Sequence, residues 1–154
     1  GAVQGELGCA RGKRLPSAWA GGGDVGRAEW IDYDGHMNVG YYQVVCDLAA
    51  DVFFDFLGLT QEFRKKHGST TFALEAHANF LREVKVGEPL RFEARLVDFD
   101  AKRIHFYQEM FHATDGYLAA CQESLSSHVS MATRRTSPMP AELLGHLPAV
   151  KAAP

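Results

Sequence analysis

The sequence has few cysteines and none of the spacings that bind metals. Its 154 residues include Cys9, Cys46 and Cys121, an odd number without a repeated pattern. We therefore expect reduced thiols in a cytoplasmic protein, rather than a disulfide framework or a zinc site. The histidines His105, His112 and His128 fall on expected strands without clustering, so no metal is expected.

The sequence also lacks long apolar runs and an excess of positive charge. No stretch approaches 18 residues without a charged residue, and the N-terminus has no basic-then-apolar signal pattern. The formal net charge of −3 disfavours nucleic-acid binding through bulk charge. No phosphate-binding or dinucleotide-binding glycine motif follows a strand. These absences predict no membrane partner, no nucleic-acid partner and no cofactor.

The strongest positive signal is one long apolar segment with helical spacing. Asn38 is a plausible N-cap before it and Gly58 a plausible C-terminal stop after it. The segment is apolar around most of its girth, so we expect a buried helix that anchors the core. The apolar positions that recur at this spacing are Tyr41, Val44, Val45, Leu48, Val52, Phe53 and Phe56.

Alternating strand patterns follow the helix, and one weaker strand pattern, at 25–31, precedes it. The pattern predicts an α+β fold, in which an antiparallel sheet of about five strands wraps around one long central helix. In the first strand after the helix, we expect the apolar face, from Phe72 to Phe80, to be buried. The four later strand segments are 71–80, 90–96, 104–111 and 117–131.

We divide the chain into three parts. We expect residues 1–28 to be a poorly structured arm or a short strand and residues 29–133 to form the folded domain. Residues 134–154 are expected to form a C-terminal tail that contains Pro138, Pro140 and Pro148 and runs over the surface. One sheet face covers the helix, and the other needs solvent or a partner. This arrangement predicts a homo-oligomer.

A polar cluster lies directly before the helix. Asp32, Asp34, His36 and Asn38 precede the helix N-terminus, where unpaired N–H groups and the positive end of the dipole converge. A carboxylate, an imidazole and free N–H donors together can perform acid–base chemistry on a carbonyl group.

This order of elements and its motif resemble a known family. The pattern Asp-x-x-Gly-His-x-Asn-x-x-x-Tyr is matched by Asp32, Gly35, His36, Asn38 and Tyr42. It resembles the hot-dog fold acyl-CoA thioesterases of the 4-hydroxybenzoyl-CoA thioesterase type. The segments 30–38, 81–90, 102–105 and 127–129 look more narrowly like the betainyl-CoA thioesterases of carnitine degradation.

The resemblance implies catalytic roles for Asp32, His36 and Asn38. Asp32 matches the catalytic carboxylate and either attacks the thioester carbonyl or activates a water; the alternative is a capping role at the helix start. His36 either orients substrate or water, or hydrogen-bonds the turn. Asn38 either positions a water or only caps the helix. Gly35 either lets the backbone approach the thioester oxygen or is an ordinary turn residue.

Further residues are candidates for binding the two halves of the substrate. Aromatic rings attract a quaternary ammonium through cation–π contacts, although rings beside a buried helix are more often core. The polar row on the first strand either lines a substrate tunnel or faces solvent, and basic residues near strand ends either bind CoA phosphates or are solvated. The acyl candidates are Trp30, Tyr33, Tyr41, Tyr42, Glu75 and His77, with Phe80 and Tyr107 as further rings, and the CoA candidates are Arg82, Lys85 and Arg103.

The function that these observations predict is hydrolysis of a small acyl-CoA by a homodimer or homotetramer, with betainyl-CoA favoured by the narrower resemblance. Coenzyme A enters as part of the substrate, so no cofactor is expected. Two alternatives stay open: a hot-dog hydratase or dehydratase, and a non-catalytic acyl-CoA binding module.

Overall fold

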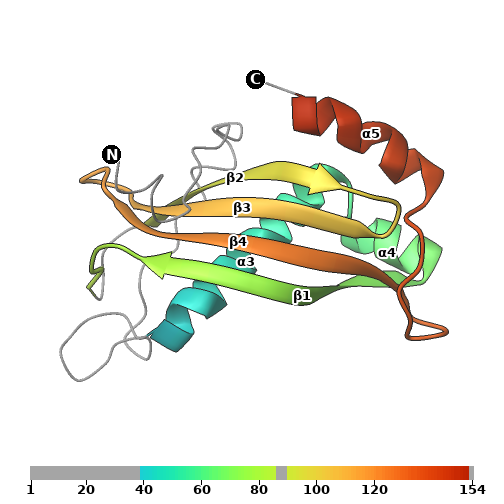
Figure 1. Cartoon of the computed structure of the whole chain (residues 1–154), viewed down its shortest axis with the longest axis horizontal. Coiled ribbons are helices and arrows are strands. Elements are labelled where there is room, and N and C mark those ends of the chain that lie inside the picture. The colour runs from blue at the N-terminus through green and yellow to red at the C-terminus, as the bar shows by residue number, and fades with distance from the viewer. Residues whose placement is uncertain (1–38, 86–89, 153–154) are drawn as a thin grey trace.

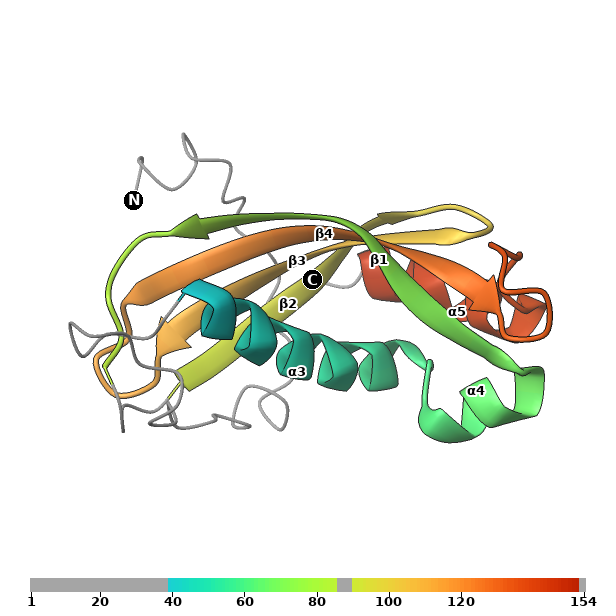
Figure 2. The same ribbon diagram turned by 90° about the horizontal axis from the view of Figure 1, so that it is seen from below.

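The computed structural model describes residues 39–85 and 90–152. They form a four-stranded antiparallel sheet in the order β1-β4-β3-β2, with one long helix on one face (Figures 1 and 2). The elements are α3 (Val39–Leu57), α4 (Gln61–His67), β1 (Ser69–Phe80), β2 (Leu90–Phe99), β3 (Arg103–His112), β4 (Leu118–Ser130) and α5 (Ala141–Ala152).

The predicted fold is confirmed by this arrangement. The four strands after the helix form where alternation placed them, and the helix ends at Gly58, whose φ of +106° suits the expected glycine stop. The strand expected at 25–31 and the N-cap Asn38 lie outside the described residues. The boundary expected between the arm at 1–28 and the domain stays a prediction.

Helix α3 packs on the sheet through one side only. Val45, Phe53 and Leu57 are buried against the sheet. On another side, Leu48, Val52 and Phe56 are 39–46% exposed, so the expectation of a helix buried around most of its girth is wrong for the single chain. The reason is geometric, because a sheet of four strands covers one side of a helix and leaves the opposite side open (Figure 2).

Strand β1 also departs from the expected burial. Phe72, Leu74 and Phe80 are 45–57% exposed, although the alternation predicts that they face the core. Among the described residues, β1 is an edge strand that pairs only with β4, and a bulge between Ala73 and Glu75 shifts its register. A bulge adds one residue to a period of two, so the residues before and after it face opposite sides of the sheet.

The C-terminal segment is part of the core rather than a surface tail. Met139, Leu143 and Leu147 are at most 3% exposed and join the cluster that contains Phe53 and Phe106. The prolines of this region suggested an irregular tail, but the four-residue spacing of Leu143 and Leu147 gives α5 one apolar side. That side covers the edge of the sheet beside β2 and thereby completes the core (Figure 1).

Candidate active site

The candidate active site lies at the end of the molecule where α3 begins. β1 ends at the same end of the sheet (Figure 2). The two elements meet there through a hydrogen bond from the Tyr42 hydroxyl to the Arg82 carbonyl, 3.5 Å long. The predicted catalytic residues precede Val39 in the chain. Asp32, His36 and Asn38, together with Trp30, Tyr33 and Gly35, lie outside the described residues, as does the side chain of Tyr41.

Two aromatic rings meet beside the first turns of α3. Tyr42 is 6% exposed and packs in the core next to Val45 and Met110. The ring of Phe80 meets it edge to face, with the centroids 5.2 Å apart, and is 45% exposed. Of the two rings, only Phe80 therefore presents a surface that a ligand can reach from solvent.

Basic residues follow directly after β1. The guanidinium carbon of Arg82 lies 4.0 Å from the centroid of the Tyr117 ring, and Arg82 and Lys85 are both exposed. The sequence interpretation missed Tyr117, because it lies 35 residues further along the chain. Only the pairing of β1 with β4 brings the two residues together, and no local motif signals that contact.

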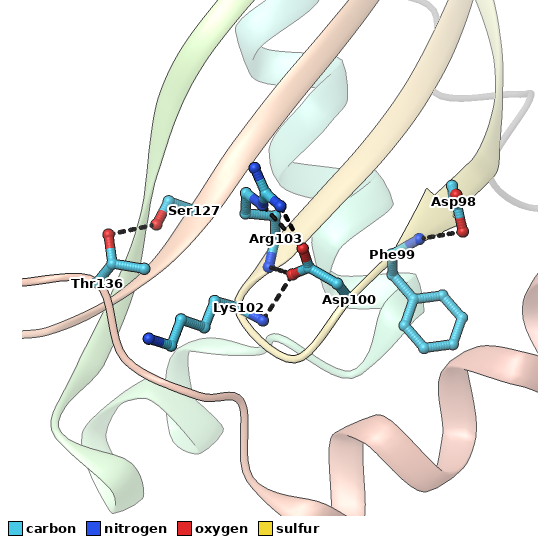
Figure 3. Close-up of polar contacts among 7 residues, drawn as sticks. All are labelled: Asp98, Phe99, Asp100, Lys102, Arg103, Ser127 and Thr136. Carbon is cyan, nitrogen blue, oxygen red and sulfur yellow. Dashed lines mark hydrogen bonds and ion pairs between the residues drawn. The ribbon is translucent and has the colours of Figure 1, made fainter.

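Arg103, the third predicted CoA contact, lies at the opposite end of the sheet, because it pairs with Ser127 whereas β1 ends beside Ala120. Figure 3 shows Arg103 beside Asp100. Arg103 begins β3, and its Nε and Nη2 atoms donate to Asp100 Oδ2 at 2.8 and 2.6 Å. The Asp100 carboxylate also accepts the backbone N–H groups of Lys102 and Arg103. Through these bonds, chiefly those from the Arg103 side chain, the pKa of Asp100 falls to about 2. The structure therefore does not bring Arg103 together with Arg82 and Lys85 in one chain.

Glu75 and His77 lie on the sheet face that points away from α3. They pair with Leu125 and Glu123 of β4 and line an open hollow of about 640 Å³ with them and His105. His105 Nε2 contacts the Glu123 carboxylate across this hollow. Tyr107 shares this face, because it pairs with Glu123 in the register of β3 and β4. Within one chain, the sheet therefore separates these residues from the start of α3, where the candidate active site lies.

The described cysteines differ from each other. Cys46 is a free thiol whose pKa is raised to about 12 by burial and, less strongly, by the neighbouring Asp47. Cys121 is disulfide-bonded, which corrects the expectation that all thiols are reduced. Residues 39–85 and 90–152 contain no cluster of three or more His, Cys, Asp or Glu side chains that could hold a metal ion.

None of the helices in the described part of the chain is long and apolar enough to cross a membrane. The cytoplasmic location stays a prediction.

The architecture is that of the hot-dog thioesterases. A 1,4-dihydroxy-2-naphthoyl-CoA thioesterase from Synechocystis superposes with a TM-score of 0.70, at 15% identity over 81% of this chain and 92% of that one. A Staphylococcus aureus protein determined in complex with CoA gives a TM-score of 0.75, at 24% identity over 86% of this chain and 85% of that one. At these identities the likeness establishes the fold.

The sequence relatives are closer. A betainyl-CoA thioesterase from Pseudomonas aeruginosa is 34% identical over 125 residues, which are 81% of this chain and 79% of that protein. An L-carnitine dehydrogenase/betainyl-CoA thioesterase from Agrobacterium fabrum is 34% identical over 144 residues. Those residues are 92% of this chain and 28% of that longer protein.

The model of the Thioesterase-like superfamily matches residues 27–147, and the chain belongs to that superfamily. The prediction of a thioester hydrolase is thereby confirmed at the level of the family. The acyl group, the catalytic residues and the assembly are not fixed by family membership.

Proposed function

We propose that this protein hydrolyses betainyl-CoA to betaine and free coenzyme A. The observation that carries the proposal is the 34% identity to the Pseudomonas aeruginosa betainyl-CoA thioesterase, which extends over most of both chains. An identity of that extent favours a shared substrate class more strongly than a shared fold does.

The proposed chemistry uses Asp32 at the start of α3. The carboxylate either attacks the thioester carbonyl or takes a proton from an attacking water. The bond between the carbonyl carbon and sulfur then breaks, and the CoA thiolate leaves and takes up the proton that the water gives up. Where Asp32 itself has attacked, that water hydrolyses the resulting mixed anhydride and regenerates the carboxylate. The first N–H groups of a helix have no partner within the helix, so those of α3 are suited to stabilise the developing oxyanion. No cofactor is needed, since coenzyme A is the leaving group.

The acyl end of betainyl-CoA carries a quaternary ammonium that cannot accept or donate a hydrogen bond. An aromatic face attracts such a cation by about 0.5–2 kcal/mol, depending on desolvation. Phe80 supplies an exposed ring near the start of α3, held edge-on by Tyr42. We propose that Phe80 forms part of the ammonium site, together with Trp30 and Tyr33.

We also propose that two copies of the chain assemble through the edge of β1. This strand has 12 residues, and within residues 39–85 and 90–152 only its edge beside β4 is paired. An open edge with exposed apolar side chains favours pairing with another strand. Phe72 and Leu74 supply apolar surface on this strand, and a second copy of the chain presents the same edge strand.

The substrate proposal is tested by comparing betainyl-CoA with its neutral isostere, 3,3-dimethylbutanoyl-CoA, in a thiol-release assay. We expect kcat/KM to favour the cation by at least about tenfold, equivalent to about 1.4 kcal/mol. Replacing Phe80 with Leu should reduce this preference without slowing hydrolysis of the neutral thioester. The exposed Met131, on the turn after β4, gives a control variant, Met131→Leu.

Three outcomes separate the proposal from its alternatives. Equal rates for the two thioesters would remove the betaine proposal and leave the thioesterase. Binding of acyl-CoA without release of thiol would indicate a binding module. Formation or loss of an α,β double bond in the acyl group would indicate a hydratase or dehydratase.

A further inference from the structure

Tyr117, which begins the return from the β3–β4 turn, is contacted at its ring by Arg82 and His112 and is held at its hydroxyl by a hydrogen bond. Arg82 lies over the ring, with its guanidinium carbon 4.0 Å from the centroid. The His112 ring stacks on it, with the centroids 5.1 Å apart and the planes 28° apart. The Tyr117 hydroxyl donates to the Glu83 carbonyl at 2.7 Å. The ring is therefore fixed both to the segment after β1 and to the end of β3.

His112 is itself held in place by hydrogen bonds to its ring and its backbone. Its Nδ1 accepts the backbone N–H groups of Asp115 and Thr114, at 2.9 and 3.3 Å, so this nitrogen carries no proton. The ring is 5% exposed, and its backbone N–H donates to the Tyr117 carbonyl across a tight turn at Gly116, where φ is +78°. These bonds and its burial fix the His112 ring where it stacks on Tyr117.

Arg82 differs from the arginines near the starts of β2 and β3, because each of those is paired with a carboxylate. The Arg91 guanidinium lies 2.8 Å from the Glu93 carboxylate, and that of Arg103 lies 2.6 Å from Asp100. Within 39–85 and 90–152, the Arg82 guanidinium has no carboxylate partner and is exposed. A cation–π contact orients a guanidinium but leaves its charge and its N–H donors available for a second ligand.

The location of Arg82 in the molecule indicates which ligand its guanidinium binds. Arg82 lies beside the start of α3, because its own carbonyl accepts the Tyr42 hydroxyl. A planar guanidinium fork matches a phosphate group, which accepts two parallel N–H bonds. If acyl-CoA is the substrate, its phosphates are the anions brought to this end of the molecule.

We propose that Tyr117 and His112 are positioning residues that hold Arg82 to bind a phosphate group of coenzyme A. The inference rests on the proposed function for the identity of the ligand. It adds to that function a physical basis for recognising the nucleotide half of the substrate, from residues on three different segments. The gain is preorganisation, because a free arginine loses side-chain entropy when a ligand fixes it.

The test is calorimetric binding of CoA and of pantetheine, which lacks the phosphates, to the full chain and four variants. Arg82→Gln should weaken CoA binding about tenfold, the loss expected for a charge-assisted contact. Tyr117→Leu should weaken it at least about threefold, and Tyr117→Phe should restore most of the affinity because the ring remains. Pantetheine should bind equally to all. Arg135→Gln, which removes an exposed arginine at the far end of β4, is the matched control.

The outcomes distinguish this inference from the proposed function. An unchanged CoA affinity in Arg82→Gln would overturn the inference, even if the protein hydrolyses thioesters. A loss in Arg82→Gln without any loss in Tyr117→Leu would overturn the positioning role. CoA binding that depends on Arg82 and Tyr117, in a protein that releases no thiol, would support the inference and contradict the proposed function. No CoA binding by the wild type would overturn both.

Discussion

Gln108 of β3 reaches helix α3 and donates a hydrogen bond from Nε2 to the Cys46 carbonyl, 3.0 Å away. Both residues are buried, and the bond is a direct polar link between helix and sheet. The remaining amide oxygen, Oε1, has no hydrogen-bond partner. The bond ties the helix that follows the predicted catalytic residues to the middle of the sheet.

The first prediction concerns this link. Gln108→Met loses one hydrogen bond but also removes an unsatisfied oxygen, so the free energy of unfolding should change by less than about 1 kcal/mol. Gln108→Glu places a buried carboxylate against a carbonyl oxygen and should cost more than about 2 kcal/mol at neutral pH. Urea denaturation measures both. A glutamate variant as stable as the methionine variant would show that the link is not buried as described.

The second prediction concerns α5. Leu143 and Leu147 are 3% and 0% exposed in the main core cluster, so replacing either with Ala should lower the free energy of unfolding by about 2–5 kcal/mol. His146, exposed on the same helix, gives the control His146→Ala, which should cost less than about 0.5 kcal/mol. Leucine variants as stable as this control would mean that α5 is not part of the core.

These elements show what the sequence could predict and where it failed. Strand β2 was predictable, since Leu90, Phe92, Ala94 and Leu96 alternate strictly and are all buried. The burial of side chains in β1 was not predictable, because the alternation of apolar residues reveals neither the bulge nor the edge position of the strand. The residues before α3 were identified by motif, whereas the Arg82–Tyr117 contact depends on tertiary pairing that no spacing in the chain reveals.

The third prediction concerns assembly. If the β1 edge joins two copies, Leu74→Lys should shift the molecular mass measured by light scattering from dimer towards monomer, because it places a charge in the apolar contact. Met131→Lys adds the same charge at a residue that is 54% exposed but lies outside the edge strand, and should leave the mass unchanged. A wild-type protein that is monomeric and fully active would contradict the proposed dimer.

The fourth prediction concerns pH. The pKa of Asp100 is lowered from 3.8 to about 2, chiefly by the Arg103 side chain, so the folded state favours the ionised carboxylate. Its contribution to stability is therefore present above about pH 4 and is lost as the pH falls towards 2. Asp100→Asn should be less stable than the wild type at about pH 5, and the difference should shrink at about pH 3. Because the pair is exposed, added salt should also reduce it. A difference that grows on acidification would contradict this sign.

The most direct measurement is the rate at which wild type and Asp32→Asn hydrolyse betainyl-CoA, monitored through the release of free thiol. The account predicts that the wild type hydrolyses this thioester and that Asp32→Asn is at least about 100-fold slower, the low end of the range for a lost general base, with unchanged folding by circular dichroism. Asp34→Asn, two residues along the same segment, should have a much milder effect, because the family pattern requires no carboxylate there. An Asp32→Asn variant within a few-fold of the wild-type rate would contradict the assignment of the catalytic carboxylate.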